Sequence, residues 1–478
     1  MQQTQELELI DYLLEDIFLI QKQQAIKLRN STASQRIALL KRLLEWINKN
    51  QEDIRKAVHA DYQKPYPEID VTEIFPVLIE INHAIKHLEH WMKPKKVGTP
   101  LIFLGTKAYV QYEPKGVSLI IAPWNYAFNL AVGPLVSAVA AGCPVIIKPS
   151  EMTPHTSALL RRMMAEIFDT HTVEVIEGGV EISQMLLSKP FEHIFFTGSP
   201  AVGKIVMKAA AEHLTSVTLE LGGKSPVLIL DDADLKDTAD KITATKFLNC
   251  GQTCIAPDYI LIPERLKDAF VEEMKKSIEK MYGSNKNGIE GSKDYSRIVN
   301  ESHFKRIQHI LSDANLKGAK IEFGGNSNGQ ENYIEPTILS HVTWEMKVLQ
   351  EEIFGPILPV VTYDNLDGAI MIVNQQPKPL AFYVFSKNNE KINAIFNETS
   401  SGAALANDCA VHFLHRELPF GGVNNSGIGK SHGHFGFLAF SNEKAVLKQR
   451  VGSAAVNPLF PPFTLVKKKL VKGILKWL

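Results

Sequence analysis

The sequence predicts an α/β protein with mainly parallel sheets and more than one domain. Its 478 residues exceed the roughly 100–200 residues that one domain usually contains. Apolar runs such as HIFFTGS and SPVLILDD alternate with amphipathic segments, of which residues 266–281 are an example. This alternation is typical of β-α-β units, whose strands form parallel sheets.

The composition is that of a globular chain without a charge bias. Hydrophobic residues make up 45% and charged residues 22% of the chain, and Lys+Arg and Asp+Glu both number 52. A net charge of zero offers no general attraction for a polyanion, so no nucleic-acid partner is expected. The 4 cysteines are too few for a disulfide scaffold in a chain of this length, which indicates a reducing compartment.

The N-terminal region is predicted to be helical. Ile37, Leu40, Leu44 and Ile47 recur at helical spacing after a cluster of serine and threonine residues that can start a helix. The first residues, MQQTQELELIDYLLEDIF, lack a basic region and a small-residue cleavage site, so a secretory signal is not expected. The predicted location is therefore cytoplasmic.

Residues 116–147 contain no charged side chain and are long enough to cross a bilayer as one helix. Pro123, Pro134 and Pro144 divide them into the strand-like run GVSLIIAP, the small-residue helical run LAVGPLVSAVAAG and a second strand-like run, CPVIIKPS. Strands covered on both faces are nearly continuous in apolar residues. We therefore expect a buried β-α-β unit rather than a membrane span.

A glycine turn follows the predicted strand HIFF. In TGSPAVGK, Gly198, Gly203 and Lys204 fit the P-loop pattern, but Ile205 stands where that pattern needs a hydroxyl for Mg²⁺. A nucleotide triphosphatase is therefore disfavoured. A glycine turn that opens a helix can still bind a diphosphate through backbone N–H groups, which favours a dinucleotide. The alternative is that these glycines only form a tight turn.

Two polar residues accompany apolar runs. Glu220 lies within VTLELGGKSP, where a buried carboxyl group would have a raised pKa and suit general-base catalysis. A glutamate pointing outward from a half-exposed strand fits the pattern equally well. Asn125 follows LIIAP, at the end of a strand where α/β sheets bind ligands, and its amide could donate to an oxyanion. Asparagine is also a common turn residue.

Seven motifs together resemble those of the aldehyde dehydrogenase superfamily. They are PWN with Asn125, KPSE with Lys148 and Glu151, FTGS with Gly198 and Ser199, LELGGK with Glu220, GQTC with Cys254, EEIFGP with Glu352 and Phe354, and PFGG at Phe420. The resemblance extends to about residue 450 and is closest to the class-three branch, whose members oxidise medium- and long-chain fatty or aromatic aldehydes. GQTCIAPDYIL, SGAALANDCAVHF and FPPF are typical of that branch.

The resemblance implies the aldehyde dehydrogenase fold, with a Rossmann-like cofactor domain, an α/β catalytic domain and a small β element that bridges subunits. The expected boundaries are residues 1–102 and 116–220 for the NAD(P)-binding domain, 221–425 for the catalytic domain, 103–115 and 426–450 for the bridging element, and 451–478 for an amphipathic tail. The class-three branch also implies a homodimer.

Cys250 and Cys254 lie four positions apart in FLNCGQTCIAPDY. A zinc site would also need Cys409, His412 or His415, but the spacing matches none of the usual zinc patterns, so no metal is expected. A structural disulfide is disfavoured in a reducing compartment. The resemblance assigns Cys254 as the nucleophile. Cys250 is expected to pack at the end of the preceding helix, although a disulfide between the two under oxidation stays open.

The mechanism that the resemblance implies is oxidation of an aldehyde to a carboxylic acid. The Cys254 thiolate attacks the carbonyl carbon, while the Asn125 side chain and the Cys254 backbone N–H hold the oxyanion. Hydride passes to the nicotinamide, and a water activated by Glu220 hydrolyses the resulting thioester. Glu220 is also a candidate base for the Cys254 thiol.

The resemblance also implies the cofactor NAD, with NADP left open. It assigns Lys148 and Glu151 to the adenine-side ribose, Gly198, Ser199 and Gly203 to the diphosphate turn, Glu352 to the nicotinamide ribose, Phe354 to the nicotinamide end, and Trp124 to the cofactor site. A carboxylate at position 151 repels a 2′-phosphate, which favours NAD. Class-three relatives with that carboxylate are nevertheless similar to enzymes that use both cofactors.

Two rival functions follow from the same fold. A CoA-acylating relative would transfer the acyl group to a thiol, but that chemistry does not need Glu220 as a hydrolytic base. A catalytically silent scaffold would have no chemical reason to keep Cys254, Asn125 and Glu220 together. We therefore expect an aldehyde-oxidising enzyme.

One departure from the branch lies in GGVNNSG, where Asn424 replaces the usual glycine. If that glycine adopts a left-handed conformation, asparagine is the least costly replacement. His432 and His434 follow this loop. Histidines in such positions are more often surface or packing residues, so they are not assigned to the site.

The C-terminal stretch LFPPFTLVKKKLVKGILKWL predicts a short basic amphipathic helix. Val466, Leu470 and Ile474 recur every four residues, while Lys468 and Lys472 share another face. Residues 465–478 are too short to span a bilayer. Two alternatives stay open: peripheral contact with an anionic membrane surface, or packing against this protein or a second copy of it.

Overall fold

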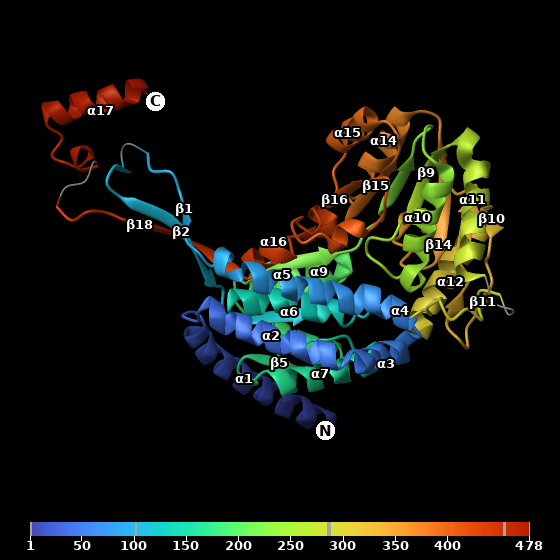
Figure 1. Ribbon diagram of the computed structural model, residues 1–478, viewed down its shortest axis with the longest axis horizontal. Helices are drawn as coiled ribbons and strands as arrows, with labels where there is room; N and C mark the ends of the chain where they lie inside the picture. The colour runs from blue at the N-terminus through green and yellow to red at the C-terminus, as the bar shows by residue number, and fades with distance from the viewer. Residues whose placement is uncertain (1, 101–102, 284–287, 453–455, 478) are drawn as a thin grey trace.

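The computed structural model describes residues 2–100, 103–283, 288–452 and 456–477. Two α/β bodies, each built around its own sheet, lie against each other, and a small third sheet extends away from the first body (Figure 1). The predicted α/β class with mainly parallel sheets is confirmed. Among the described residues, no helix combines the length and apolar character needed to cross a membrane.

The N-terminal part of the chain is helical, as predicted. Its elements are α1 (Gln2–Leu28), α2 (Ala33–Lys49), α3 (Gln51–Tyr62), α4 (Tyr66–Ile69), the π-helical turn η1 (Asp70–Ile74) and α5 (Phe75–Trp91). Thr32 Oγ1 accepts a hydrogen bond from Gln35 N at 3.3 Å, and Gln35 Oε1 accepts one from Thr32 N at 2.8 Å. This reciprocal cap fixes the start of α2, from which Leu40, Leu43 and Ile47 face the core.

The first sheet has the strand order β17-β7-β6-β3-β4-β5 and is parallel except for β17. Its strands and helices are β3 (Ser118–Ile121), α6 (Asn129–Ala141), β4 (Val145–Lys148), α7 (Pro154–Ile167), β5 (Val173–Val175), α8 (Val180–Leu187), β6 (His193–Gly198), α9 (Pro200–Ala211), β7 (Ser216–Leu221) and β17 (Gly427–Ile428). The uncharged residues 116–147 form β3, α6 and β4, so the predicted β-α-β unit is confirmed. Burial on both faces explains their apolar pattern.

The second sheet has the order β10-β13-β14-β9-β8-β15-β16 and is parallel except for β10. Its elements are β8 (Pro226–Ile229), α10 (Leu235–Phe247), the 3₁₀ turn η3 (Leu248–Gly251), β9 (Tyr259–Pro263), α11 (Glu264–Tyr282), α12 (Glu301–Leu316), β10 (Lys320–Phe323), β13 (Thr337–Ser340), α13 (Lys347–Gln350), β14 (Ile357–Tyr363), α14 (Leu366–Gln375), β15 (Ala381–Phe385), α15 (Asn389–Glu398) and β16 (Ala403–Ala406). A two-stranded ribbon, β11 (Ser327–Asn328) and β12 (Tyr333–Ile334), lies outside this sheet. The short turns η4 (Val411–Leu414) and η5 (Asn424–Ser426) follow β16.

The third sheet is antiparallel and has the order β1-β2-β18. It consists of β1 (Lys95–Lys96), β2 (Lys107–Pro114) and β18 (Ser441–Lys448), with α16 (Gly433–Ala439) just before β18. In Figure 1 this sheet projects from the first body, and the turn η6 (Asn457–Leu459) and helix α17 (Leu465–Trp477) lie beyond its far end. The predicted tail is thus helical.

The domain boundaries inferred from the resemblance stay a prediction. Residues 427–428, which the resemblance places in the bridging element, form β17, and Gly427 pairs with Glu220 of β7. The return of the chain to the first sheet therefore brings residues 420–432 beside the strand that carries Glu220.

Candidate active site

A cavity of about 380 Å³ has both Cys254 and Glu220 in its wall. Other lining residues come from η1, α6, α10 and residues 409–420. Most of them are apolar, including Phe413 and Phe420. A largely apolar cavity with a few reactive groups is typical of a site for a small apolar molecule.

Cys254 follows a strained turn. Asn249 and Cys250 have φ angles of 51° and 54°, a region that residues other than glycine rarely adopt. Gly251 continues the turn with a φ of 75°, and a Cβ at this position would collide with the carbonyl group of Gly355. The turn therefore needs a glycine at its third position and support from outside at the first two.

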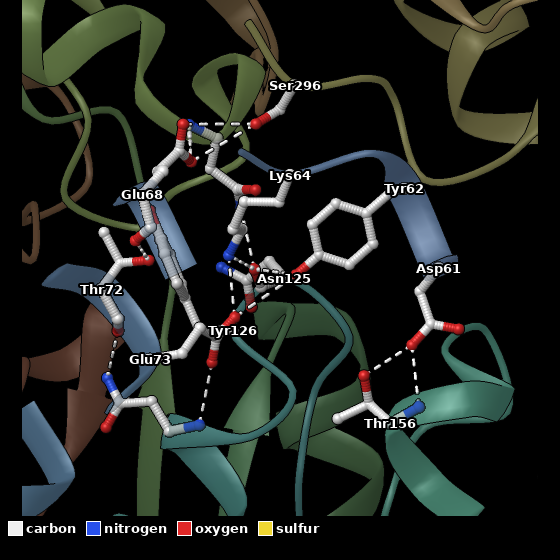
Figure 2. A network of polar contacts seen from close by, with 12 residues as sticks. Asp61, Tyr62, Lys64, Glu68, Thr72, Glu73, Asn125, Tyr126, Thr156 and Ser296 are labelled. Carbon is white, nitrogen blue, oxygen red and sulfur yellow. Dashed lines mark hydrogen bonds and ion pairs between the residues drawn. The ribbon is translucent and has the colours of Figure 1, made fainter. Parts of the chain in front are cut away.

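Hydrogen bonds from distant residues supply that support (Figure 2). The Asn249 N–H donates to Glu68 Oε1 at 2.8 Å, and Ser296 Oγ donates to Glu68 Oε2 at 3.3 Å. Asn249 Nδ2 donates to the carbonyl oxygens of Asn125 at 2.8 Å and Gln252 at 3.1 Å. Burial raises the pKa of Glu68 to about 7. The turn before Cys254 is thus tied to the helical layer and to the loop after β3.

Cys254 is half-buried in the cavity wall, and its surroundings favour the neutral thiol. Burial is the largest cause, and the carboxyl groups of Glu352 and Glu220 add to it; together they raise the pKa of Cys254 to about 12. The thiolate is the nucleophilic form of cysteine. The thiol therefore needs a base or a nearby positive charge before it can react.

Glu220 of β7 is 5% exposed and faces the cavity, so the alternative of an outward-pointing side chain is wrong. Its Oε1 accepts a hydrogen bond from Ser431 Oγ at 2.9 Å, and its Oε2 has no hydrogen-bond partner among the described residues. Burial raises the pKa of Glu220 to about 8, although the Ser431 hydroxyl and the Lys430 ammonium oppose this shift. A carboxylate with one free oxygen and a pKa near neutrality can act as a general base.

Asn125 lies in the loop after β3 and is 3% exposed. Its Nδ2 donates to the carbonyl oxygen of Gln252 at 3.0 Å, close along the chain to Cys254. An amide group carries two N–H donors, so a second one remains for an oxyanion. Asn125 is not among the residues that line the cavity, and its catalytic role stays a prediction.

The residues expected to bind the cofactor lie at the carboxyl ends of neighbouring strands. β6, β3 and β4 are adjacent in the first sheet, and parallel α/β sheets bind ligands at such ends. The residues in or just after these strands are Trp124, Lys148, Glu151, Gly198, Ser199 and Gly203. The fold therefore brings three separate sequence motifs to one edge of the sheet.

Their contacts fit the chemistry of a dinucleotide. Lys148 Nζ forms an ion pair with Glu151 Oε2 at 3.0 Å. Ser199 caps α9 by accepting a backbone N–H bond at 3.3 Å, and the first N–H groups of such a helix can bind a diphosphate. A Cβ at Gly203 would lie 2.7 Å from a methyl group of Leu221, so glycine lets α9 pack closely on β7. A carboxylate, an ammonium group and free backbone donors together suit ribose hydroxyls and phosphates.

Glu352 and Phe354 approach from the segment between α13 and β14. Burial raises the pKa of Glu352 to about 8, and the negative charge of Asp258 adds to the shift. Glu352 lies so close to Gly222 that a Cβ there would collide with its carboxyl group. The rings of Phe354 and Trp124 meet edge to face with centroids 5.4 Å apart. The site thus adds a carboxyl group and an aromatic pair.

Three positions that follow the PFGG motif in the sequence bear on the sequence-based expectations. His432, which the sequence does not assign to the site, lies in the cavity wall, where its ring stacks on Phe420 with centroids 4.9 Å apart. His434 instead lies against Phe437, with centroids 6.0 Å apart. Asn424 has a φ of 54°, so this position meets the condition under which asparagine is the least costly replacement for glycine.

A buried ion pair beside the site has no sequence motif. Lys64 Nζ lies 2.8 Å from Glu73 Oε1, and neither side chain is exposed. Lys64 Nζ also donates to the Asn125 carbonyl oxygen at 3.3 Å (Figure 2). Charged side chains are rarely fully buried, so the sequence gives no sign that these two lie inside.

The remaining cysteines do not form a metal site. Cys250 is fully buried and its Sγ donates to Tyr295 Oη at 3.3 Å, and all four cysteines are free. Within the described part of the chain, the three potential ligand atoms that lie within 4.8 Å of one another belong to His83, His87 and Glu417. The cysteine and histidine set weighed for zinc is not such a group.

Comparisons with known proteins agree with this geometry. The model described as the aldehyde dehydrogenase family matches residues 19–446. The chain is 46% identical to 4,4'-diaponeurosporen-aldehyde dehydrogenase of Staphylococcus aureus over 438 residues, which cover 91% of this chain and 94% of that protein. It is 45% identical to aldehyde dehydrogenase family 3 member A2 of Pongo abelii, with 89% of this chain and 87% of that protein covered.

Solved structures show the same fold. A substrate-bound structure of Staphylococcus aureus AldH matches with a TM-score of 0.92 and 43% identity, over 97% of this chain and 99% of that one. An aldehyde dehydrogenase of Mycobacterium tuberculosis complexed with NAD+ matches with a TM-score of 0.80 and 28% identity, over 89% of this chain and 87% of that one.

Proposed function

The chain belongs to the aldehyde dehydrogenase family and is an oxidoreductase that acts on aldehydes, and we propose that it oxidises medium- or long-chain aliphatic or aromatic aldehydes to carboxylic acids with NAD(P). The observation that carries this proposal is the largely apolar cavity with Cys254 and Glu220 in its wall. An apolar cavity suits a hydrocarbon or aromatic aldehyde because the apolar surface of both leaves water. Similarity to family 3 members supports the same substrate class.

Cys254 is the proposed nucleophile. Its thiolate attacks the carbonyl carbon of the aldehyde and forms a thiohemiacetal. The proton of the thiol passes to Glu220, whose carboxyl group lies in the same cavity wall and has a pKa raised to about 8. Since the pKa of Cys254 is higher, at about 12, this transfer is uphill unless a positive charge near the sulfur stabilises the thiolate.

Asn125 is the proposed oxyanion donor. One N–H of its amide is bonded to Gln252, and the second one stabilises the negative charge that develops on the carbonyl oxygen, together with the Cys254 backbone N–H. Loss of a hydride equivalent, for which the bound cofactor would supply the acceptor, converts the thiohemiacetal into a thioester on Cys254. Glu220 next releases the thiol proton to solvent and, as a carboxylate again, removes a proton from the water that attacks this thioester. Ser431 holds Oε1 and leaves Oε2 free for that water.

The proposed cofactor is NAD, and NADP stays a candidate. When bound, the oxidised nicotinamide supplies the acceptor for the hydride equivalent lost by the substrate and a positive ring charge. We propose that Lys148 and Glu151 hold the adenine-side ribose, Ser199 and the start of α9 the diphosphate, and Glu352 the nicotinamide ribose. The NAD+ complex of the Mycobacterium tuberculosis relative supports this cofactor.

Two further features of the proposal concern assembly and location. We propose a cytoplasmic homodimer that uses the sheet β1-β2-β18, which projects from the body (Figure 1). We also propose peripheral contact of α17 with anionic membranes, because Leu465 and Val466 are 78% and 77% exposed beside exposed lysines. Equal liposome flotation of the full chain and a chain ending at Val456 would end the membrane proposal. Packing of the helix against this protein or a second copy of it would then be the remaining alternative.

The experiment for the enzymatic proposal compares Cys254→Ala with Cys250→Ala. Formation of reduced NAD and NADP is followed with aldehydes from short aliphatic to long-chain and aromatic. We expect turnover to disappear in Cys254→Ala and to persist in Cys250→Ala, since Cys250 packs in the core. Turnover that survives in Cys254→Ala would overturn the mechanism. A wild type that binds NAD but oxidises no aldehyde would favour a scaffold or a CoA-acylating enzyme.

A further inference from the structure

Lys64 and Glu73 form an ion pair that water does not reach. Their Nζ and Oε1 atoms are 2.8 Å apart, and both side chains are 0% exposed. Taking two charges out of water is costly, so a buried ion pair is weak evidence of stabilisation in itself. The surroundings of the pair point to another role.

The pair bonds to Asn125 and to Asn129, which are the first and last residues of the stretch 125–129 that leads into α6. Lys64 Nζ donates to the Asn125 carbonyl oxygen at 3.3 Å, and Glu73 Oε2 accepts the Asn129 N–H at 2.9 Å. Tyr62 Oη donates to the same Asn125 oxygen at 3.0 Å. Figure 2 shows Tyr62 and Lys64 converging on Asn125 beside Glu73. With so many donors on one carbonyl group, the backbone of Asn125 has little freedom to turn its amide.

The same ammonium group also contacts Tyr126, which is bonded to the residue before the nucleophile. Lys64 Nζ lies 4.2 Å from the ring centroid of Tyr126, a distance typical of a cation–π contact. Tyr126 Oη and Thr253 Oγ1 form a hydrogen bond of 2.5 Å, and Thr253 directly precedes Cys254. One buried cation therefore contacts both the loop of Asn125 and a residue that is bonded to the loop of Cys254.

Glu73 gains its position from the π-helical turn η1, which joins α4 and α5. Such turns insert one residue into a helix and occur frequently at functional sites. The carbonyl oxygen of Thr72, the residue before Glu73, accepts a hydrogen bond from Asn129 Nδ2 at 3.0 Å. Two hydrogen bonds therefore join η1 to Asn129, the first residue of α6. The irregular turn and the buried pair thus act on the same segment.

We propose that the Lys64–Glu73 pair positions the Asn125 amide and the Cys254 sulfur relative to each other during attack on the aldehyde. Neither residue of the pair lines the cavity, so both are positioning residues and not catalytic ones. This inference rests on the proposed role of Asn125 as an oxyanion donor. It adds the buried ion pair that holds the Asn125 amide in position.

Lys64→Met and Glu73→Gln test the inference. Each removes one charge of the pair, and we expect kcat to fall about 10- to 100-fold, the usual result of misplacing reacting groups by about 1 Å. The KM for the aldehyde should change little because the cavity wall is intact. Leu43→Ala is the control for general loss of stability, because it opens the buried core around α2 but has no bond to Asn125. Its kcat should therefore stay close to that of the wild type. Wild-type kcat in both charge variants would overturn the inference.

A double-mutant cycle with Asn125→Ala separates positioning from general damage. If Lys64 acts through the amide of Asn125, Lys64→Met should lower kcat by less than about threefold once that amide is gone. Full additivity of the two losses would overturn the inference while leaving the proposed function intact. An Asn125→Ala variant with unchanged kcat would overturn the oxyanion role itself, and the inference with it.

A separate cluster on α5 carries a second inference. His83 and His87 lie four residues apart with ring centroids 4.5 Å from each other, and Glu417 Oε1 lies 3.4 Å from His83 Nε2. One ligand atom from each residue lies within 4.8 Å of the others. Two histidines at this helical spacing and a carboxylate are a donor set that suits Zn²⁺ with an open position.

Two positive side chains lie near this cluster. The charge of the Arg416 guanidinium is balanced by the buried Glu80 at 3.2 Å, and Lys86, on the same helix as the histidines, is exposed to solvent. Glu417 is 70% exposed, so its carboxylate can rotate toward an ion. We infer that His83, His87 and Glu417 bind Zn²⁺ and so tie α5 to the end of the segment that lines the cavity.

Calorimetric titration of the full chain with Zn²⁺ tests this site. The Cys254→Ala background is used throughout so that the thiol does not compete for the metal. We expect one bound equivalent, and a loss of affinity of more than about tenfold in His87→Ala and in Glu417→Gln. His90→Ala, an exposed histidine on the same helix, should bind as the background does. Equal affinity in His87→Ala, Glu417→Gln and His90→Ala would overturn the site.

Discussion

The cofactor edge of the first sheet and the turn that carries Cys254 are held in different ways. At the cofactor edge the polar contacts are local: Lys148 bonds to Glu151, three positions along the chain. At the catalytic turn they are distant, since Asn249 bonds to Glu68 and Asn125, which are 181 and 124 positions away. The Lys148–Glu151 pair therefore forms within one short motif, although the sheet must bring three such motifs together to make the cofactor edge. The catalytic turn requires that the whole fold be assembled first.

This difference has a consequence for substitutions. A change at the cofactor edge should alter cofactor affinity and leave the rest of the site in place. A change at the catalytic turn or in its supports should lower kcat or unfold the turn, because several hydrogen bonds converge there and the backbone is strained.

The largest effect is expected from Asn125→Ala. Loss of one oxyanion donor costs about 10²- to 10³-fold in kcat in enzymes of comparable chemistry. Lys148→Met should instead raise the KM for NAD and change kcat much less. Steady-state kinetics of both variants measure the contrast. A loss of kcat that is equal in the two variants would break the distinction between the two regions.

The next effect is on stability. In Gly251→Ala the new Cβ meets a backbone carbonyl group at a left-handed φ, so we expect a loss of about 3 kcal/mol in the free energy of unfolding. In Gly203→Ala it meets only the movable side chain of Leu221, and the better helix propensity of alanine partly offsets a cost of about 1 kcal/mol. Urea unfolding measures both losses. A larger loss of unfolding free energy in Gly203→Ala than in Gly251→Ala would contradict the account.

A smaller effect on stability depends on pH and concerns Glu220. Its pKa in the folded protein is raised to about 8, so the folded state binds this proton more tightly than the unfolded chain does. The stability gained from the neutral carboxyl group is full below the unfolded pKa and is lost as the pH rises through about 8. Between about pH 6 and pH 8, wild type should lose about 2 kcal/mol relative to Glu220→Gln. A pH-independent difference in melting temperature would contradict the assignment.

The smallest effect is expected from Glu151→Gln at the cofactor edge. Its side chain is 44% exposed, so solvent weakens the repulsion of a 2′-phosphate. The ratio of kcat/KM for NADP to that for NAD should rise by about three- to tenfold. The conservative Glu151→Asp, which keeps the charge, serves as the control. An unchanged ratio in Glu151→Gln would remove Glu151 from cofactor selection.

The sequence predicts the parts of this molecule that depend on local pattern. The apolar runs around Pro123 and Pro144 predict β3 and β4 because strands buried on both faces have no polar side to show. The residue type at Asn424 also agrees with its left-handed conformation, because asparagine tolerates this conformation better than most residues other than glycine.

The parts that depend on distant contacts could not be predicted. Nothing in PYPEIDVTEI distinguishes the buried Glu73 from a solvated glutamate, because its burial results from packing against α6 and the loop of Asn125. His432 lies in the cavity wall, a few residues after the two-residue strand β17 that pairs with β7. A strand of two residues is too short to be predicted from alternating hydrophobicity. The motif residues thus indicate the chemistry, and the tertiary contacts determine its geometry.

The central claim is that oxidation proceeds through an acyl group on Cys254. It is tested most directly by acid-quenching the Cys250→Ala variant during its first turnover with NAD and a long-chain aldehyde, followed by mass spectrometry of the peptide that contains Cys254. The account predicts a mass increase of one acyl group on Cys254. Turnover without any adduct on Cys254 would contradict it.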